Sequence, residues 1–178
     1  QKYGTAATGN TSFGYIGGGQ SGAPTLSSVD RIDYSNDTAT ASPKGPLSNN
    51  RQFLTATGNA SFGYFGGGGP GSFSTVDRID YSNDTANASP KGPLSAARRY
   101  LAATGNDSFG YFAGGIPDVS TIDRIDYSND TATAAVKGPL STVRRIGAAV
   151  SSQENGLPQI SIVPASTVRE NVAPQGTD

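Results

Sequence analysis

The chain of 178 residues contains no histidine and no cysteine, so carboxylates and hydroxyls are the side chains that could do chemistry. Without imidazole or thiol groups, this chain cannot build the Ser-His or Cys-His nucleophilic sites or the usual zinc sites. A hydrolase that relies on carboxylates alone is the remaining enzymatic design. We therefore expect that the protein is not an enzyme and uses no cofactor.

Three aspartates recur in each repeat of the sequence and raise the question of a calcium site: Asp30, Asp33 and Asp37 in the first repeat. An EF-hand loop needs alternating oxygen ligands and a distal glutamate, and this spacing does not supply them. Asp30 and Asp33 would also point to opposite faces of a strand. We predict ion pairs with Arg31 and turn capping by Asn36 and Asp37, with no metal.

Other motifs have structural interpretations too. The glycine runs lack the Gly-Lys-Ser/Thr sequence of a phosphate-binding loop and precede no helical pattern. Asn-x-Ser/Thr triplets lie in repeated turns, whose chemistry accounts for them. Neighbouring arginines at 98–99 and 144–145 would face opposite sides, favouring solvation or pairing between sheets over one basic stripe. Phe13 and Tyr15 share a face, which favours core packing over a sugar platform.

All of these residues belong to a threefold internal repeat. The segment Ser-Phe-Gly-Tyr recurs with its phenylalanine at Phe13, Phe62 and Phe109, in steps of 49 and 47 residues. The segments Asp-Arg-Ile-Asp-Tyr-Ser-Asn-Asp-Thr and Lys-Gly-Pro-Leu-Ser recur in the same order. Such a period is typical of β-propeller blades and similar arrays. With 24 glycines and 11 prolines, the chain is poorly suited to long helices.

Each repeat should form four short strands. In the third repeat we predict strands at 98–104, 109–112, 120–127 and 131–136, separated by Gly-Asn, Ser-Asn-Asp and Gly-Pro turns. Four strands in about 47 residues match one blade of a propeller. The predicted fold class is therefore all-β, with four-stranded blades that form part of a β-propeller or an open blade array.

The repeats resemble kelch repeats across residues 1–149. Kelch units carry a glycine doublet after an apolar strand, then a Tyr-Asp-like pair and then a tryptophan. The doublets here are Gly17-Gly18, Gly66-Gly67 and Gly114-Gly115, and the pairs are Ile32-Asp33, Ile79-Asp80 and Ile125-Asp126. Alanine replaces the tryptophan at Ala39, Ala86 and Ala132. The resemblance implies three kelch-like blades, the first of them truncated at its start.

The amino-acid sequence of the repeat also resembles that of arrays in predicted virion or tail-fibre-like proteins of marine cyanobacterial phages. This resemblance implies that the protein is a structural or adhesive virion component, located in the virion or outside the cell. The partners would be other copies, other virion proteins or a host-surface glycan, with no nucleic acid and no membrane insertion. A second version of this structural role is a self-assembling fibre in which the end blades of neighbouring copies stack on each other. The alternative is a non-viral, carbohydrate- or protein-binding kelch-type propeller.

Length variation among the repeats is concentrated after the glycine runs, which places loops at 20–28, 69–74 and 116–120. These loops vary while the scaffold does not, as a recognition surface would. The candidate ligand-binding residues are Gln20, Ser21, Pro70, Ser72, Pro117 and Asp118. Beyond the repeats, residues 150–172 are predicted to form a Pro-containing insert or linker, and residues 173–178 align with the start of a further repeat.

Overall fold

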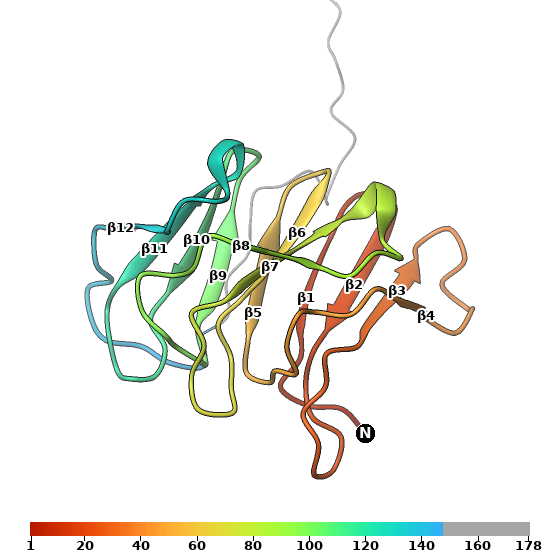
Figure 1. Ribbon diagram of the computed structural model, residues 1–178, viewed down its shortest axis with the longest axis horizontal. Coiled ribbons are helices and arrows are strands. Elements are labelled where there is room, and N and C mark those ends of the chain that lie inside the picture. Colours follow the sequence, from red (N-terminus) through yellow and green to blue (C-terminus); the bar gives the residue numbers. More distant parts are fainter. Residues whose placement is uncertain (148–178) are drawn as a thin grey trace, which may run out of the picture.

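The computed structural model describes residues 1–147, which form three four-stranded antiparallel sheets with strands in sequential order (Figure 1). The first sheet comprises β1 (Ala6–Gly9), β2 (Phe13–Gly17), β3 (Val29–Asp33) and β4 (Ser42–Lys44). The second comprises β5 (Thr55–Gly58), β6 (Phe62–Gly66), β7 (Val76–Asp80) and β8 (Ser89–Lys91). The third comprises β9 (Ala102–Gly105), β10 (Phe109–Ala113), β11 (Ile122–Asp126) and β12 (Ala135–Lys137). The all-β class and the four strands per repeat are thus confirmed.

Asparagine and aspartate side chains set the turns within each sheet. Asn10 Oδ1 accepts hydrogen bonds from the backbone N–H groups of Ser12 and Phe13, both at 2.9 Å, and so closes the turn between β1 and β2. Asp80 caps the short 3₁₀ helix η1 (Tyr81–Asn83) by accepting from Ser82 N–H, and Asp126 does the same for η2 (Tyr127–Asn129). These side chains accept hydrogen bonds from backbone N–H groups of the turns, which the strand ladders leave unpaired.

The three sheets pack face to face, with β5 lying between β1 and β9 (Figure 1). Tyr15 of the first sheet stacks on Tyr81 of the second, with ring centroids 4.7 Å apart, and Tyr64 stacks on Tyr127 in the same way. A Cβ atom on Gly17 would lie 2.8 Å from the ring of Phe65. A phenylalanine therefore fills the space that a glycine leaves on the neighbouring sheet.

Arginines in the segments between sheets tie neighbouring sheets together. The carbonyl group of Arg51 accepts from Gly19 N–H of the first sheet's loop, while its guanidinium group reaches Asp77 of the second sheet at 2.6 Å. Arg98 repeats this arrangement with Gly68 and Asp123. Both ion pairs are buried. The prediction that Arg98 is solvated or pairs between sheets is wrong for its side chain, which pairs with Asp123 of its own repeat, while its backbone N–H and carbonyl groups contact the preceding sheet.

Three of the four predicted strands of the third repeat differ in their bounds, and only the strand predicted at 109–112 is matched closely, by β10. The strand predicted at 98–104 begins at Ala102, because Tyr100 has a φ of 59° that interrupts the extended backbone. The strand predicted at 120–127 ends at Asp126, where η2 begins. The strand predicted at 131–136 shortens to Ala135–Lys137, because the turn after η2 continues first.

The predicted roles of the aspartates also need correction. Asp33, rather than Asn36 or Asp37, caps the turn after β3, by accepting from the backbone N–H and hydroxyl group of Ser35. Arg31 pairs with Asp84 of the following repeat instead of with the aspartates of its own repeat. The sequence could not show this pairing, because it crosses between sheets. The insert predicted at 150–172 and the further repeat predicted at 173–178 lie outside the described residues.

Candidate binding rim

The loops predicted at 20–28, 69–74 and 116–120 connect the second and third strands of their sheets and lie along one edge of the molecule, the lower edge in Figure 1. We call this edge the rim. Isolated bridges join each loop to the segment that leads into a sheet: Tyr3 pairs with Gln20, Gln52 with Gly69, and Arg99 with Ile116. The structure therefore brings all three predicted loops to one surface.

In the first loop, Gln20 stabilises its own turn. Its Nε2 donates to the carbonyl oxygens of Gly22 at 2.7 Å and Ala23 at 3.4 Å, and Ser21 N–H donates to Pro24 at 3.3 Å. Both candidate residues are only partly exposed. Gln20 thus has a structural role, and the exposed residues of this loop are Gly22, Ala23 and Pro24.

The second and third loops each carry an exposed proline after a cis peptide bond, at Pro70 and Pro117. Ser72 is partly exposed, whereas Asp118 is exposed and lies 3.7 Å from the guanidinium group of Arg145. An exposed ion pair of this length contributes little stability and leaves the carboxylate accessible to a ligand. Pro70, Pro117 and Asp118 are therefore the most accessible of the predicted candidates.

The sequence reasoning missed a row of aromatic side chains beside these loops. Tyr3, Phe53 and Tyr100 lie next to one another, with ring centroids 6.4 Å and 4.2 Å apart. Tyr3 is 49% exposed, and the row continues to Ile146, which is 74% exposed and donates its N–H to Tyr100. Aromatic rings at a polar edge are suited to stacking on the apolar faces of sugars.

Backbone conformation, more than residue type, positions this row. Phe53, Tyr100 and Ile146 all have φ between 56° and 59°, and Gly4 has a φ of 66° at the corresponding place. Phe53 N–H donates to Gly4 and Tyr100 N–H donates to Phe53, so a ladder of hydrogen bonds crosses the repeats. The signal available in the sequence was the recurrence of aromatic residues two positions after Arg51 and Arg98.

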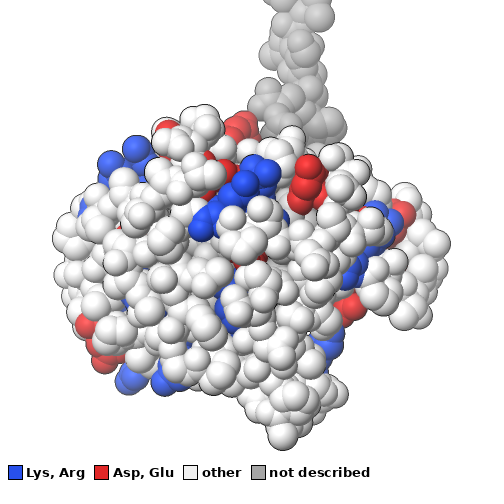
Figure 2. Space-filling view, in the orientation of Figure 1, with Lys and Arg blue, Asp and Glu red and all other residues white. Residues whose placement is uncertain are grey.

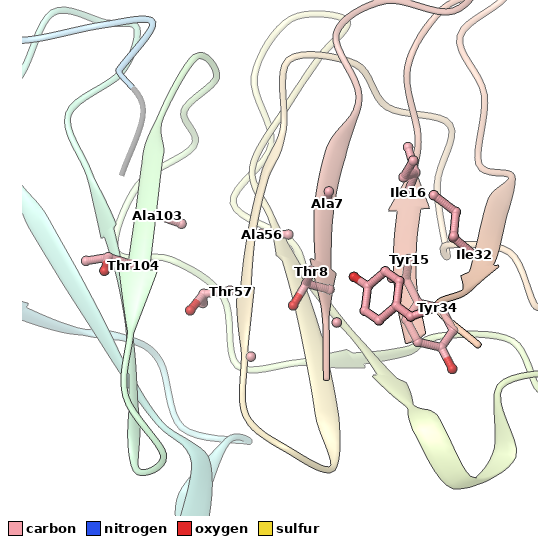
Figure 3. A pocket seen from close by; sticks show the side chains of 13 residues that line it. Ala7, Thr8, Tyr15, Ile16, Ile32, Tyr34, Ala56, Thr57, Ala103 and Thr104 are labelled. Carbon is pink, nitrogen blue, oxygen red and sulfur yellow. The ribbon is translucent and has the colours of Figure 1, made fainter. Parts of the chain in front are cut away.

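A hollow of about 320 Å³ lies along the innermost strands (Figure 3). Its lining includes Thr8, Thr57 and Thr104 from the three sheets, together with Tyr34 from the end of the first sheet. The hydroxyl group of Thr8 is hydrogen bonded to Tyr81, and that of Thr57 to Tyr127. No carboxylate or cationic side chain lines this hollow, so it offers no acid or base pair for catalysis.

Networks of ion pairs and hydrogen bonds lie between neighbouring sheets. Asp84 accepts from Tyr15 Oη at 2.9 Å and Arg31 Nη1 at 2.7 Å, and Lys44 Nζ lies 3.2 Å from its other oxygen. Burial opposes ionisation of Asp84, but these donors outweigh it and lower its pKa. Burial and the bond to Asp84 raise the pKa of Tyr15 to about 12. Asp130, Tyr64 and Arg78 repeat this network.

The surface offers no concentrated charge on the face shown in Figure 2, where acidic and basic side chains lie interspersed among uncharged residues. Within residues 1–147, no group of three or more acidic side chains is placed to hold a metal ion. The same part of the chain contains no helix long and apolar enough to span a membrane.

Comparison with known proteins adds no family assignment. No protein-family model matches the chain, and no curated protein matches it. The interpretation of the rim therefore rests on its geometry.

Proposed function

We propose that the protein is a structural and adhesive component of a virion, such as a phage fibre or tail-associated protein. Its sheets act as kelch-like blades of a β-propeller or open blade array, and the rim loops contact a glycan on the host surface. The observation that carries the proposal is the gathering of three dissimilar loops on one edge of three nearly identical sheets. Loops that vary on a constant scaffold are the usual carriers of recognition.

The aromatic row supports a glycan as the ligand. Tyr3, Phe53 and Tyr100 supply ring surface, while Asp118 and Ser72 supply polar groups beside it. A sugar needs both, because its C–H faces stack on aromatic rings while its hydroxyls need hydrogen-bonding partners. The chain would act by holding several weak contacts in fixed positions, and no chemical step is involved.

Binding of the purified 178-residue chain to arrayed glycans tests the adhesive role. We expect at least one glycan class to bind, and Tyr100→Ala and Asp118→Ala each to weaken that binding about tenfold, the size of a loss at one important contact. The matched control for Asp118→Ala is Asp107→Ala. Asp107 is also exposed, but it lies in the turn between β9 and β10, away from the rim.

Unchanged thermal unfolding of the three variants would show that any loss of binding is local. Equal binding by wild type, Tyr100→Ala and Asp118→Ala would contradict the assignment of the rim. Failure of every glycan to bind would contradict the adhesive role itself.

The alternative, a non-viral carbohydrate-binding propeller, would satisfy the same binding test because the same aromatic row would serve it. Mass spectrometry of purified phage particles separates the two. The virion proposal predicts this chain in the particles at a fixed ratio to the other tail proteins. Absence from particles of a phage that encodes it would favour the non-viral protein.

A further inference from the structure

The two internal interfaces between sheets are built from the same parts. On one side, each presents Tyr15, Gly17 and Arg31, or their counterparts Tyr64, Gly66 and Arg78. On the other side, each presents Phe65, Tyr81 and Asp84, or their counterparts Phe112, Tyr127 and Asp130. Since the chain repeats, the outer faces of the first and third sheets carry one half of this interface each.

The outer face of the third sheet, here called the trailing face, consists of Tyr111, Ala113, Ile122, Arg124 and Leu140. Tyr111 is the counterpart of Tyr15 and Tyr64, whose side chains are 0% exposed, yet among the described residues nothing stacks on it. A hollow of about 500 Å³ with a mainly apolar lining lies over this face. Arg124 has no carboxylate partner within residues 1–147, whereas its counterparts Arg31 and Arg78 pair with Asp84 and Asp130.

The outer face of the first sheet, here called the leading face, consists of Gly14, Ile16, Tyr34 and Asp37. Tyr34 lies over Gly14 as Tyr81 lies over Gly63, with the hydroxyl oxygen 2.6 Å and 2.7 Å, respectively, from the position of a glycine Cβ. Tyr34 is nevertheless 53% exposed, and Asp37 is exposed, whereas Tyr81 and Asp84 are buried. The leading face is thus already arranged as in an internal interface.

Two substitutions at the outer faces complement each other. Internally, phenylalanine meets glycine: Phe65 presses on Gly17, and a Cβ on Gly66 would lie 2.4 Å from the ring of Phe112. At the outer faces, the phenylalanine position holds the smaller Ile16 and the glycine position holds the larger Ala113. A shorter side chain opposite an added methyl group preserves the packing, so these two faces fit each other better than either would fit an internal face.

We infer that the trailing face of one molecule binds the leading face of a second copy of this chain, head to tail. Tyr34 of the second copy stacks on Tyr111, and Asp37 accepts from Tyr111 and Arg124, as Asp84 accepts from Tyr15 and Arg31. Gly138 matches Gly45 and Gly92, where the backbones of neighbouring sheets meet, and no described atom lies within 4 Å of its Cβ position. The backbone of the second copy fits into that space.

This docking displaces one short segment. Lys2 and Arg144 occupy corresponding places before the first sheet and after the third, so residues 1–4 of the incoming copy must leave the place that 144–147 of the other copy takes. Lys2 gives up an ion pair with Asp30 that is about one-third exposed, and such pairs contribute little stability. Tyr3 gives up its bridge to Gln20 and its place beside Phe53, so in the assembly the aromatic row consists of Phe53 and Tyr100 and continues to Ile146. Arg144 then takes over Asp30, as Arg51 holds Asp77.

A head-to-tail contact repeats from copy to copy, so it produces a closed ring or a filament. Two copies would supply six sheets, which is within the range of about four to eight that closes a propeller. Sedimentation of the 178-residue chain should therefore give a species of twice 18.1 kDa or larger, in a concentration-dependent manner. A monomer at all concentrations would overturn the inference.

Ile16→Arg blocks the leading face, and Ala113→Arg blocks the trailing face. We expect each variant alone to be monomeric. An equimolar mixture should form a heterodimer that grows no further, because the intact trailing face of Ile16→Arg meets the intact leading face of Ala113→Arg. Association of either variant alone, or no heterodimer in the mixture, would contradict head-to-tail docking.

Size exchange tests the fit without adding charge. Ile16→Phe should weaken association at least tenfold, because its ring meets the methyl group of Ala113, and the double variant Ile16→Phe/Ala113→Gly should restore association by recreating the internal pair. Thermal unfolding at dilute concentration checks that every variant folds. Equal association of the single and double variants would place the contact elsewhere.

Discussion

At the scale of single residues, one arginine position of the repeat has two environments. Arg51 and Arg98 are buried and paired with Asp77 and Asp123, whereas Arg144 at the same position is exposed, because no described sheet follows it. Arg51 Nη1 also donates to the carbonyl groups of Gly67 and Thr75, both at 2.9 Å. One guanidinium group thus joins the backbone and a carboxylate of the second sheet.

Arg51→Ala should lower the free energy of unfolding by about 3–5 kcal/mol, because Asp77 would remain as a buried, unpaired charge. Arg144→Ala is the matched control and should change it by no more than about 0.5 kcal/mol. Urea unfolding followed by circular dichroism, at a concentration where the chain is monomeric, measures both. Equal effects of the two substitutions would contradict the role assigned to the buried pair.

The interfacial tyrosines predict instability in alkali. Burial raises the pKa of Tyr15 and Tyr127 to about 12, and that of Tyr64 and Tyr81 further. Unfolded tyrosines ionise near pH 10. The contribution of these tyrosines to the free energy of unfolding is therefore fully present below pH 10. It falls as the pH rises from 10 towards 12, since the tyrosines of the unfolded chain release their protons first.

Urea midpoints measured between pH 8 and 12, at a concentration where the chain is monomeric, test this expectation. The exposed counterpart Tyr34 serves as the control, because Tyr34→Phe should leave the shape of the profile unchanged. A flat profile up to pH 12 would mean that the tyrosines are not buried between the sheets.

At the scale of elements, neighbouring sheets meet where the fourth strand ends. Gly45 N–H donates to the backbone carbonyl oxygen of Asp84 at 2.9 Å, and Gly92 N–H donates to that of Asp130 at 2.8 Å. A Cβ atom on Gly45 would lie 1.8 Å from the carbonyl oxygen of Ala86. This close approach of two backbones accounts for the glycine of the Lys-Gly-Pro segment in the first two repeats.

Gly45→Ala should cost about 1–3 kcal/mol, because the added methyl group meets rigid backbone. Gly138→Ala should instead be neutral or stabilise the monomer by up to about 1 kcal/mol, since its surroundings are open and alanine restricts the unfolded chain. Thermal unfolding of the two variants compares them directly. A destabilised Gly138→Ala monomer would show that this site is already covered within the chain.

The sequence predicted the elements unevenly. Turn residues and period gave four strands per repeat, and β10 almost to the residue, because these are local properties. The strand predicted at 98–104 was wrong up to Tyr100, which has a positive φ and donates its N–H to Phe53 in the preceding segment. A bond between segments that are 47 residues apart leaves no local signal.

At the scale of the whole molecule, the chain is a stack of equivalent sheets with complementary outer faces. The loops at the rim could be predicted, since length variation marks them. The aromatic row could be predicted only in part: Phe53 and Tyr100 recur two positions after an arginine, but Tyr3 becomes their neighbour only when the sheets stack. The same holds for the Tyr15–Asp84 network, whose members are 69 residues apart.

We propose that these sheets form part of a larger assembly in which every sheet has neighbours on both faces. Electron microscopy of the native assembly, with the sheets counted in each closed ring or filament turn, tests this claim most directly. We predict more than three sheets in each unit, with the third sheet of one copy against the first sheet of the next. Isolated particles of three sheets would contradict it.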